Sequence, residues 1–224
     1  MASSGIPALD KLLGGEGYPD KSAVLVVGPP GIAKEALGYW FTYSGLLQGD
    51  FCLYVTRVSV QDVLRDQRAF GIDTTQKVPL WMAADGGQIP YNLNDLASLS
   101  FSIKDVLKRN GDRRIRIAMD VLSPLLILNP PDTIYKFLSQ LFTDLKQYNA
   151  VLLATVEEGM HSPQALAAMQ QVFDGVVELK LYQDGLRLQS LLQVVKMRGV
   201  ATEPGYYNFR LSRSGMEIRG EYAR

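Results

Sequence analysis

Residues 28–35 have the types and spacing of a loop that binds phosphate, with two of the expected residues replaced. The segment GPPGIAKE follows the apolar run AVLVV and precedes a stretch with helical spacing. The phosphate-binding pattern G-x-x-x-x-G-K-[ST] is met at Gly28 and Lys34, but Ala33 replaces its second glycine. Glu35 stands where a serine or threonine hydroxyl normally ligates Mg²⁺. The pattern fits a weakened phosphate site and equally a loop that no longer holds a ligand.

The two replacements change the chemistry of such a loop in different ways. Backbone N–H groups and the helix N-terminus normally hold the phosphates, while the lysine neutralises the β- and γ-phosphates. Ala33 adds a methyl group where the backbone must approach phosphate. The Glu35 carboxylate could ligate the metal, pair with Lys34, or only complement the positive end of the helix dipole. The residues expected to contact ATP or ADP with Mg²⁺ are Gly28, Pro29, Pro30, Gly31, Ile32, Ala33, Lys34 and Glu35.

Short apolar runs alternate with helical periodicities, which predicts βαβ units and a mainly parallel sheet. The expected strands are Ala23–Val27, Phe51–Thr56, Val78–Ala83, Ile115–Asp120 and Val151–Thr155. The expected helices are Glu35–Leu47, Val60–Phe70, Leu93–Lys108 and Thr133–Gln147, the last with Asp132 as N-cap. After Phe173, residues alternate as they do in antiparallel strands, which predicts such strands at Gly175–Leu181, Leu186–Val195 and Tyr206–Leu211. The Asp184-Gly185 pair predicts a type I′ turn between the first two. We therefore expect one α/β domain over residues 1–224, a parallel sheet flanked by helices and closed by antiparallel strands.

Composition excludes several classes of protein. Lysine and arginine together number 23, as do aspartate and glutamate, so no overall charge attracts nucleic acid or an anionic membrane. A single cysteine, Cys52, excludes a cysteine metal cluster within one chain and suits a reducing compartment. No apolar run reaches the ~20 residues of a membrane helix, and the first residues lack a signal peptide's pattern. We expect a cytoplasmic chain with no membrane contact.

Several segments resemble the KaiC-like branch of the RecA-superfamily ATPases. They are GIPALDKLLGG (residues 5–15), the loop itself, YVT (54–56), AMDVLSPLL (118–126), DGVVELKL (174–181) and VVKMRG (194–199). The resemblance covers nearly the whole chain in order. It implies a RecA-like P-loop NTPase core that forms a head-to-tail homo-oligomer, with ATP held between adjacent subunits.

The resemblance also implies where hydrolytic residues should lie. Family members usually have a pair of glutamates after the second strand, which orient the attacking water. Here YVT is followed by Arg57, Val58 and Ser59, so no carboxylate falls there. Asp62 and Glu157 are the candidate substitutes, although a solvated carboxylate at a strand end is the plainer interpretation of Glu157. We therefore expect ATP hydrolysis to be weak or absent.

Three further residues match family positions around the phosphates. Asp120 corresponds to the Walker-B aspartate, which holds Mg²⁺ through water. Lys196 and Arg198 correspond to basic residues that reach the γ-phosphate on the neighbouring subunit. The alternative for these two is a pair of outward-facing strand residues at i, i+2 spacing.

Two other features invite a functional interpretation. His161 has no second histidine or cysteine near it in the sequence, so we expect a solvated loop histidine. The basic stretch from Lys104 to Arg116 could contact single-stranded DNA, but a helix C-terminus that runs into an edge strand explains it as well. Nucleic-acid binding is therefore not our expectation.

Together these features favour a KaiC-like protein with a degenerate ATP site. Such a pseudo-ATPase would act as a regulatory or assembly component with a protein partner. A slow but genuine ATPase in signal transduction is one alternative. An accessory protein like the RadA paralogues, binding single-stranded DNA, is the other.

Overall fold

Helices and strands alternate through most of the chain, as the periodicity predicts. The computed structural model describes residues 1–224 except 76, 84, 213–214 and 223–224. The elements of the described residues are, in chain order, α1 (Pro7–Leu12), β1 (Ala23–Gly28), α2 (Glu35–Gln48), β2 (Phe51–Thr56), α3 (Val60–Ala69), β3 (Leu80–Ala83), α4 (Leu96–Arg109), β4 (Ile115–Met119), α5 (Leu122–Leu128), α6 (Pro131–Gln147), β5 (Ala150–Glu157), α7 (Pro163–Val172), β6 (Gly175–Asp184), β7 (Arg187–Met197), β8 (Tyr207–Ser212) and β9 (Gly215–Glu221).

The strands form one sheet in the order β3-β2-β4-β5-β1-β6-β7-β8-β9. Neighbouring strands from β3 to β6 run parallel, and those from β6 to β9 run antiparallel. This confirms the predicted mixed sheet. β1 lies inside the sheet, and β5 separates it from β4. The carboxyl ends of β1, β5, β4 and β2 therefore lie along one edge of the sheet.

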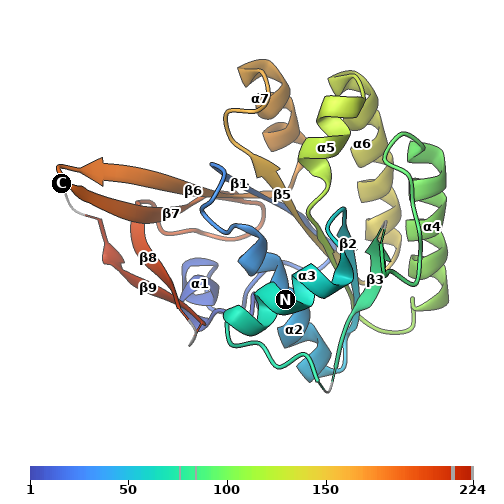
Figure 1. Ribbon diagram of the computed structural model, residues 1–224, viewed down its shortest axis with the longest axis horizontal. Coiled ribbons are helices and arrows are strands. Elements are labelled where there is room, and N and C mark those ends of the chain that lie inside the picture. The colour runs from blue at the N-terminus through green and yellow to red at the C-terminus, as the bar shows by residue number, and fades with distance from the viewer. Residues whose placement is uncertain (76, 84, 213–214, 223–224) are drawn as a thin grey trace.

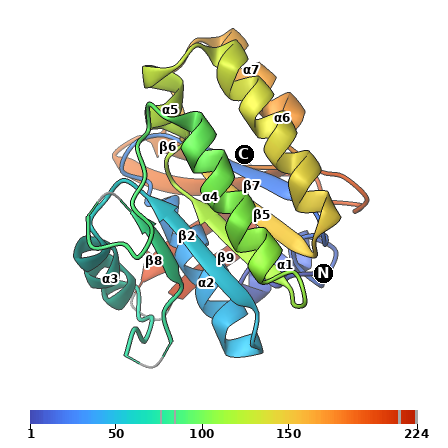
Figure 2. The same cartoon turned by 90° about the vertical axis from the view of Figure 1, so that its right-hand side faces the viewer.

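Helices cover the two faces of the parallel part of the sheet (Figures 1 and 2). Alternate residues of β1 pack on opposite sides, as a period of two requires. Val24 and Val26 belong to the cluster formed with α1, α2 and α3. Leu25 and Val27 belong to the cluster formed with α4, α5, α6 and α7. Burial on both faces explains why β1 reads as a continuous apolar run rather than an alternating one.

Two helix starts differ from the predicted ones because capping chemistry decides them. α4 begins at Leu96 because the Asp95 side chain accepts a hydrogen bond from the Ser98 N–H group. α6 begins at Pro131, where the fixed φ of proline suits a first helical position. Asp132 lies inside the first turn and makes no side-chain cap, so the prediction that it is the N-cap was wrong.

Several short helices and one strand were not predicted from the sequence. α1 and α5 have 6 and 7 residues, too few for a helical period to stand out. α7 and β9 were also missed, and β3 begins at Leu80 rather than Val78. In the β6–β7 hairpin Asp184 pairs with Arg187, so the turn residues are Gly185 and Leu186. Gly185 has φ 58, and glycine at the first turn position fits type II′ rather than type I′.

Arg116 corrects the interpretation of the basic stretch. It lies in β4, which is flanked by β2 and β5 and is not an edge strand. Its side chain is 0% exposed, so it is not available to a nucleic acid. The guanidinium group donates to Asp50 Oδ2 at 2.7 Å, Ser3 O at 2.6 Å, Phe41 O at 3.1 Å and Gln48 Oε1 at 2.9 Å. This arginine therefore ties the N-terminal segment and α2 to the sheet.

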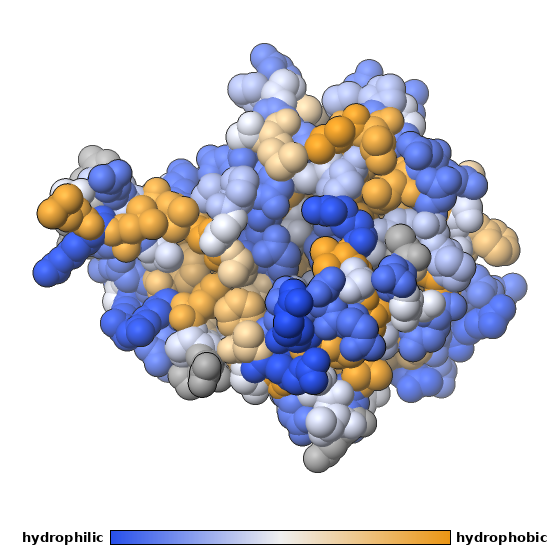
Figure 3. All heavy atoms as spheres, in the orientation of Figure 1, coloured by the Kyte–Doolittle hydropathy of each residue, from blue (hydrophilic) through white to orange (hydrophobic). Residues whose placement is uncertain are grey.

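Part of the exposed apolar surface lies on the β6–β7 hairpin. The β6–β7 hairpin projects away from α4–α7, with apolar surface along it (Figures 1 and 3). Leu186 and Leu188 are fully or largely exposed there. No helix among the described residues has the length and hydropathy needed to cross a membrane.

Candidate functional site

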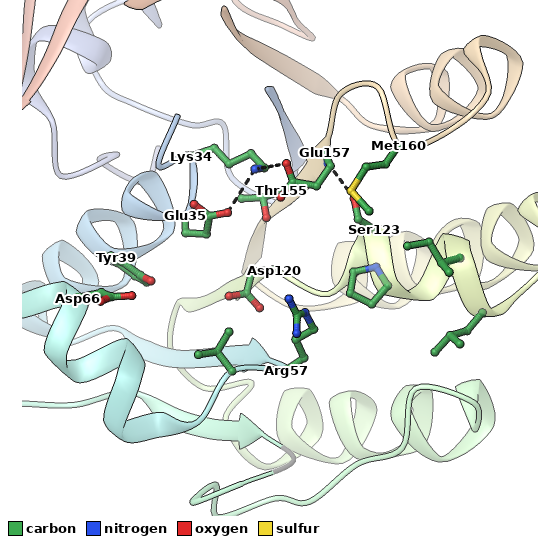
Figure 4. Close-up of a pocket in the computed structure, with 14 residues that line it drawn as sticks. Lys34, Glu35, Tyr39, Arg57, Asp66, Asp120, Ser123, Thr155, Glu157 and Met160 are labelled. Atoms are coloured by element: carbon green, nitrogen blue, oxygen red, sulfur yellow. Dashed lines mark hydrogen bonds and ion pairs between the residues drawn. The ribbon is translucent and has the colours of Figure 1, made fainter. Parts of the chain in front are cut away.

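A pocket of about 540 Å³ opens at the carboxyl ends of the parallel strands (Figure 4). In open α/β sheets this edge is where ligands bind. Lys34 and Glu35 reach the pocket from the loop after β1 and the start of α2, Asp120 from the end of β4, and Glu157 from the end of β5. The other lining residues are Tyr39, Arg57, Val58, Asp66, Ser123, Pro124, Ile127, Leu128, Thr155 and Met160. The sheet thus assembles four of the residues that the sequence singled out.

Lys34 is held by two carboxylates of its own chain. Its side chain is 2% exposed, and its Nζ lies 2.6 Å from Glu157 Oε2 and 3.3 Å from Glu35 Oε1. The interpretation of Glu157 as a solvated strand-end acid was therefore wrong. Of the three roles considered for Glu35, the structure shows the ion pair with Lys34 and a place in the first turn of α2, where a carboxylate complements the helix dipole. A phosphate that approaches Lys34 must compete with both carboxylates.

The loop backbone gives a second reason why the missing glycine matters. Gly31 has φ 82 and Ala33 has φ 56, so both lie in the left-handed region. That conformation costs an L-residue about 1–2 kcal/mol but costs glycine almost nothing. Ala33 is thus a conformational as well as a steric departure from the pattern. Within the same loop Ile32 is buried in the core and fastens the loop to the sheet.

Asp120 is the most unusual carboxylate of the pocket. Its Oδ2 accepts a hydrogen bond from Thr56 Oγ1 at 3.0 Å, whereas its Oδ1 is buried without a hydrogen-bond partner. Burial raises the pKa of Asp120 to about 7, and the negative charge of Glu35 adds to this effect. The hydrogen bond from the Thr56 hydroxyl and the positive charge of Arg57 act in the opposite direction. An oxygen in this state is suited to accept a proton, a cation or a cation-bound water.

The end of β2 supplies a cation to the pocket rather than a carboxylate. Arg57 and Val58 line it, in agreement with the sequence. Asp62 is not brought to the pocket. Its carboxylate accepts a hydrogen bond from Ser59 Oγ at 2.7 Å, and its own N–H group donates to the same oxygen, so Asp62 belongs to the N-cap of α3. Asp66, one turn later, lines the pocket instead, and no motif in the sequence pointed to it.

Ser123 and His161 form a support that the sequence analysis missed. Ser123 Oγ accepts a hydrogen bond from the Glu157 N–H group at 2.8 Å and lies 3.0 Å from His161 Nε2. His161 is therefore not simply a solvated loop residue. Partial burial lowers its pKa, and the Glu157 charge opposes that effect. The contact connects α5 with the segment after β5 and helps to position Glu157.

The comparison with protein families decides the assignment. The sequence model of the family described as "ATPase: KaiC" matches residues 2–222. The chain belongs to this family. The RecA-like α/β fold agrees with that membership, which also supports nucleotide binding with Mg²⁺.

Individual KaiC-family relatives are similar over most of this chain. Circadian clock protein KaiC2 from Synechocystis is 27% identical over 225 residues, which cover 98% of this chain and 39% of that protein. The circadian clock oscillator protein KaiC from Synechococcus elongatus is 28% identical over 213 residues, 90% of this chain and 41% of that protein. A UPF0273 protein from Pyrobaculum aerophilum is 28% identical over 237 residues, 95% of this chain and 80% of that protein. The chain thus spans less than half of the two KaiC proteins.

The pocket residues fit a magnesium ion in part. Asp120 Oδ1 is free to accept from a metal-bound water, as the Walker-B interpretation requires. Glu35 offers a carboxylate where the family pattern has a hydroxyl. Among the described residues no three His, Cys, Asp or Glu side chains converge on one metal position. Glu35 and Asp120 would therefore hold the ion together with water or phosphate oxygens, and the ion would neutralise phosphate charge.

Lys196 and Arg198 lie at the other end of the sheet. Lys196 Nζ donates to Phe173 O at 2.7 Å, and Arg198 Nη1 donates to Asp174 Oδ1 at 3.0 Å. Asp174 also accepts from the Ala23 N–H group, at the start of β1. The loop begins at the opposite end of β1, roughly 17 Å away at about 3.3 Å per residue. The structure does not bring these two residues to the pocket of their own chain.

Proposed function

We propose that this KaiC-family chain binds Mg-ATP weakly, hydrolyses it slowly or not at all, and acts as a regulatory or assembly component. The observation that carries the proposal is the state of Lys34. Its ammonium group is buried between Glu157 and Glu35, at 2.6 Å and 3.3 Å. Charge-assisted pairs of this kind are about twice as strong as neutral hydrogen bonds. Phosphate binding must offset the loss or weakening of both contacts.

The surroundings of the loop support nucleotide as the ligand. Gly31, Ile32 and Ala33 line a second pocket of about 700 Å³, whose other wall comes from β6, β7, β8 and β9 and from Phe70. That wall combines apolar side chains with amides and two arginines, Arg210 and Arg219. The loop thus separates a charged pocket from a mixed one. A nucleotide that places its phosphates on the loop would have its terminal phosphate toward Lys34 and its base toward the second pocket.

Weak hydrolysis follows from the placement of the carboxylates. An attacking water needs a base or an orienting acid in line with the terminal phosphate. The end of β2 offers Arg57 and Val58, and Glu157 is engaged by Lys34. Phosphate release with Mg-ATP is therefore expected to stay close to the uncatalysed background.

Repair of the loop tests the proposal. We expect Ala33→Gly with Glu35→Thr to tighten Mg-ATP binding roughly tenfold or more, because ~1.4 kcal/mol corresponds to one decade. The double variant relieves the left-handed alanine, frees one contact of Lys34 and restores the hydroxyl ligand. Calorimetric titration measures the affinity, Ala33→Gly alone separates the two contributions, and Lys34→Ala in the repaired loop should abolish the gain.

A turnover assay on the same proteins completes the test. Hydrolysis should remain near background in the repaired loop, since Arg57 and Val58 are unchanged. Unchanged affinity after repair would contradict the role given to Glu35 and Ala33. Robust phosphate release by the natural chain, lost in Lys34→Ala, would contradict the weak-hydrolysis half of the proposal.

We also propose that copies of the chain associate head to tail. Lys196 and Arg198 are separated from their own loop by the length of β1, so only a second copy can bring them to a nucleotide bound there. Arg198 is 71% exposed, so its side chain is accessible to a second copy even while it is paired with Asp174. Light scattering should show self-association that ATP strengthens.

Arg198→Ala should remove the effect of ATP on self-association, whereas Arg187→Ala, on the exposed hairpin, should retain it. A monomer both with and without ATP would disprove the contact.

A further inference from the structure

The pocket at the strand ends has an excess of negative charge. Two cationic side chains, Lys34 and Arg57, face four carboxylates, those of Glu35, Asp66, Asp120 and Glu157. When all six side chains are ionised, the imbalance amounts to two charges. A free nucleotide, which is itself a polyanion, would be repelled by this arrangement, whereas a divalent cation would neutralise it.

Two of the carboxylates have oxygen atoms available to a cation. Asp120 Oδ1 is buried in the pocket wall and has no hydrogen-bond partner. Glu35 projects into the same pocket from the first turn of α2 (Figure 4) and is 33% exposed. Its distance to Lys34 Nζ, 3.3 Å, is longer than the 2.6 Å between Lys34 and Glu157. Glu157 is thus the closer partner of Lys34, so Glu35 can turn toward a second cation and give up only the longer of the two contacts.

We propose that Glu35 and Asp120 bind a divalent cation of the Mg²⁺ type in the absence of nucleotide, so that the cation binds first and the nucleotide second. Mg²⁺ usually keeps several waters and binds proteins through one or two carboxylates. Two carboxylates are therefore enough for Mg²⁺, although no cluster of three His, Cys, Asp or Glu side chains occurs among the described residues. In the usual loop the serine or threonine hydroxyl is neutral, so the cation also needs the negative charge of a bound phosphate. A glutamate at this position supplies negative charge itself, and the cation can then bind without phosphate.

The order of binding rests on the proposed nucleotide site, but the cation site does not. A cation between Glu35 and Asp120 would cancel the excess charge of the pocket. It would also draw Glu35 away from Lys34 and leave the ammonium group to Glu157 alone. Both changes lower the cost of bringing a phosphate to the loop. Nucleotide affinity should therefore depend on the free cation concentration as well as on the Mg-ATP concentration.

Manganese is a suitable probe because its binding is directly visible by electron paramagnetic resonance. The full chain, free of nucleotide, should bind one Mn²⁺, and Mg²⁺ should compete for it. Glu35→Gln and Asp120→Asn should each weaken Mn²⁺ binding by roughly ten- to a hundredfold, at least the loss seen for residues that support metal ligands. The matched control is Glu158→Gln, because Glu158 adjoins Glu157 but is absent from the pocket lining. Its Mn²⁺ affinity should be unchanged.

Glu35→Thr distinguishes a lost ligand from a damaged fold. This variant should lose nucleotide-free Mn²⁺ binding and yet bind Mg-ATP more tightly, a gain that a misfolded protein could not show. The proposal is overturned if the natural chain binds no Mn²⁺ without nucleotide, or if Glu35→Gln and Asp120→Asn both retain it. Either result leaves nucleotide binding by the loop untouched, because that is measured separately by titration with Mg-ATP.

Discussion

At pH 8 and without divalent cations, Asp120→Asn is expected to raise the free energy of unfolding by roughly 1–3 kcal/mol. The substitution removes a buried negative charge whose Oδ1 has no partner. The asparagine carbonyl can still accept the hydrogen bond from Thr56 Oγ1. Chemical denaturation of the two proteins measures the difference. Glu158→Gln, outside the pocket lining, should change stability by less than about 0.5 kcal/mol.

The gain from Asp120→Asn should depend on pH in a predictable direction. Burial raises the pKa of Asp120 from an ordinary value near 4 to about 7 in the folded chain. Between these values the folded state binds a proton that the unfolded state has lost, so this group makes stability fall as pH rises. Above pH 7 its full penalty is present. The difference between variant and natural chain should therefore be large at pH 8 and shrink toward pH 5; a difference that grows at low pH would contradict the assignment.

Arg116→Ala is expected to lower the free energy of unfolding by about 3–5 kcal/mol, because removing one partner of a buried ion pair leaves the other charge buried without compensation. The guanidinium group makes four hydrogen bonds and lies over the Phe41 ring, 5.1 Å from its centroid. The Asp50 carboxylate, 11% exposed, would lose its salt bridge. Because whole domains are stable by only about 5–15 kcal/mol, this loss is severe.

Two further variants keep the Arg116 prediction testable if the alanine variant does not fold. Arg116→Lys retains the charge but cannot reproduce the planar, forked hydrogen bonds, so an intermediate loss is expected. Arg109→Ala removes an arginine that is 74% exposed and paired with Asp105 at i, i+4, and it should cost less than about 0.5 kcal/mol. Equal losses for Arg109→Ala and Arg116→Ala in urea unfolding would contradict the role of Arg116 as an anchor.

Local sequence patterns were sufficient for most of the fold. β2 was predicted with the bounds that the structure shows, and α2 differs by one residue. Both are regular enough for their side-chain period to be visible without neighbours. α5 was missed because a helix of 7 residues, apolar at six of them, shows no polar face. The hairpin turn was shifted by one residue because strand pairing, and not the Asp-Gly dipeptide, decides which two residues lie in the turn.

The sequence by itself determined that Gly28 and Asp120 lie at strand ends, that Lys34 lies just before a helix, that Glu35 replaces a hydroxyl, and that no carboxylate follows β2. These are statements about residue types and local order. Only the tertiary structure decided that Lys34 pairs with Glu157, a residue 123 positions away, and that Asp120 Oδ1 is buried without a partner. It also decided that Arg116 is an internal anchor and that Asp66, rather than Asp62, faces the pocket. Such properties depend on which strand ends become neighbours and on how much water they exclude, and both arise only when the sheet is assembled.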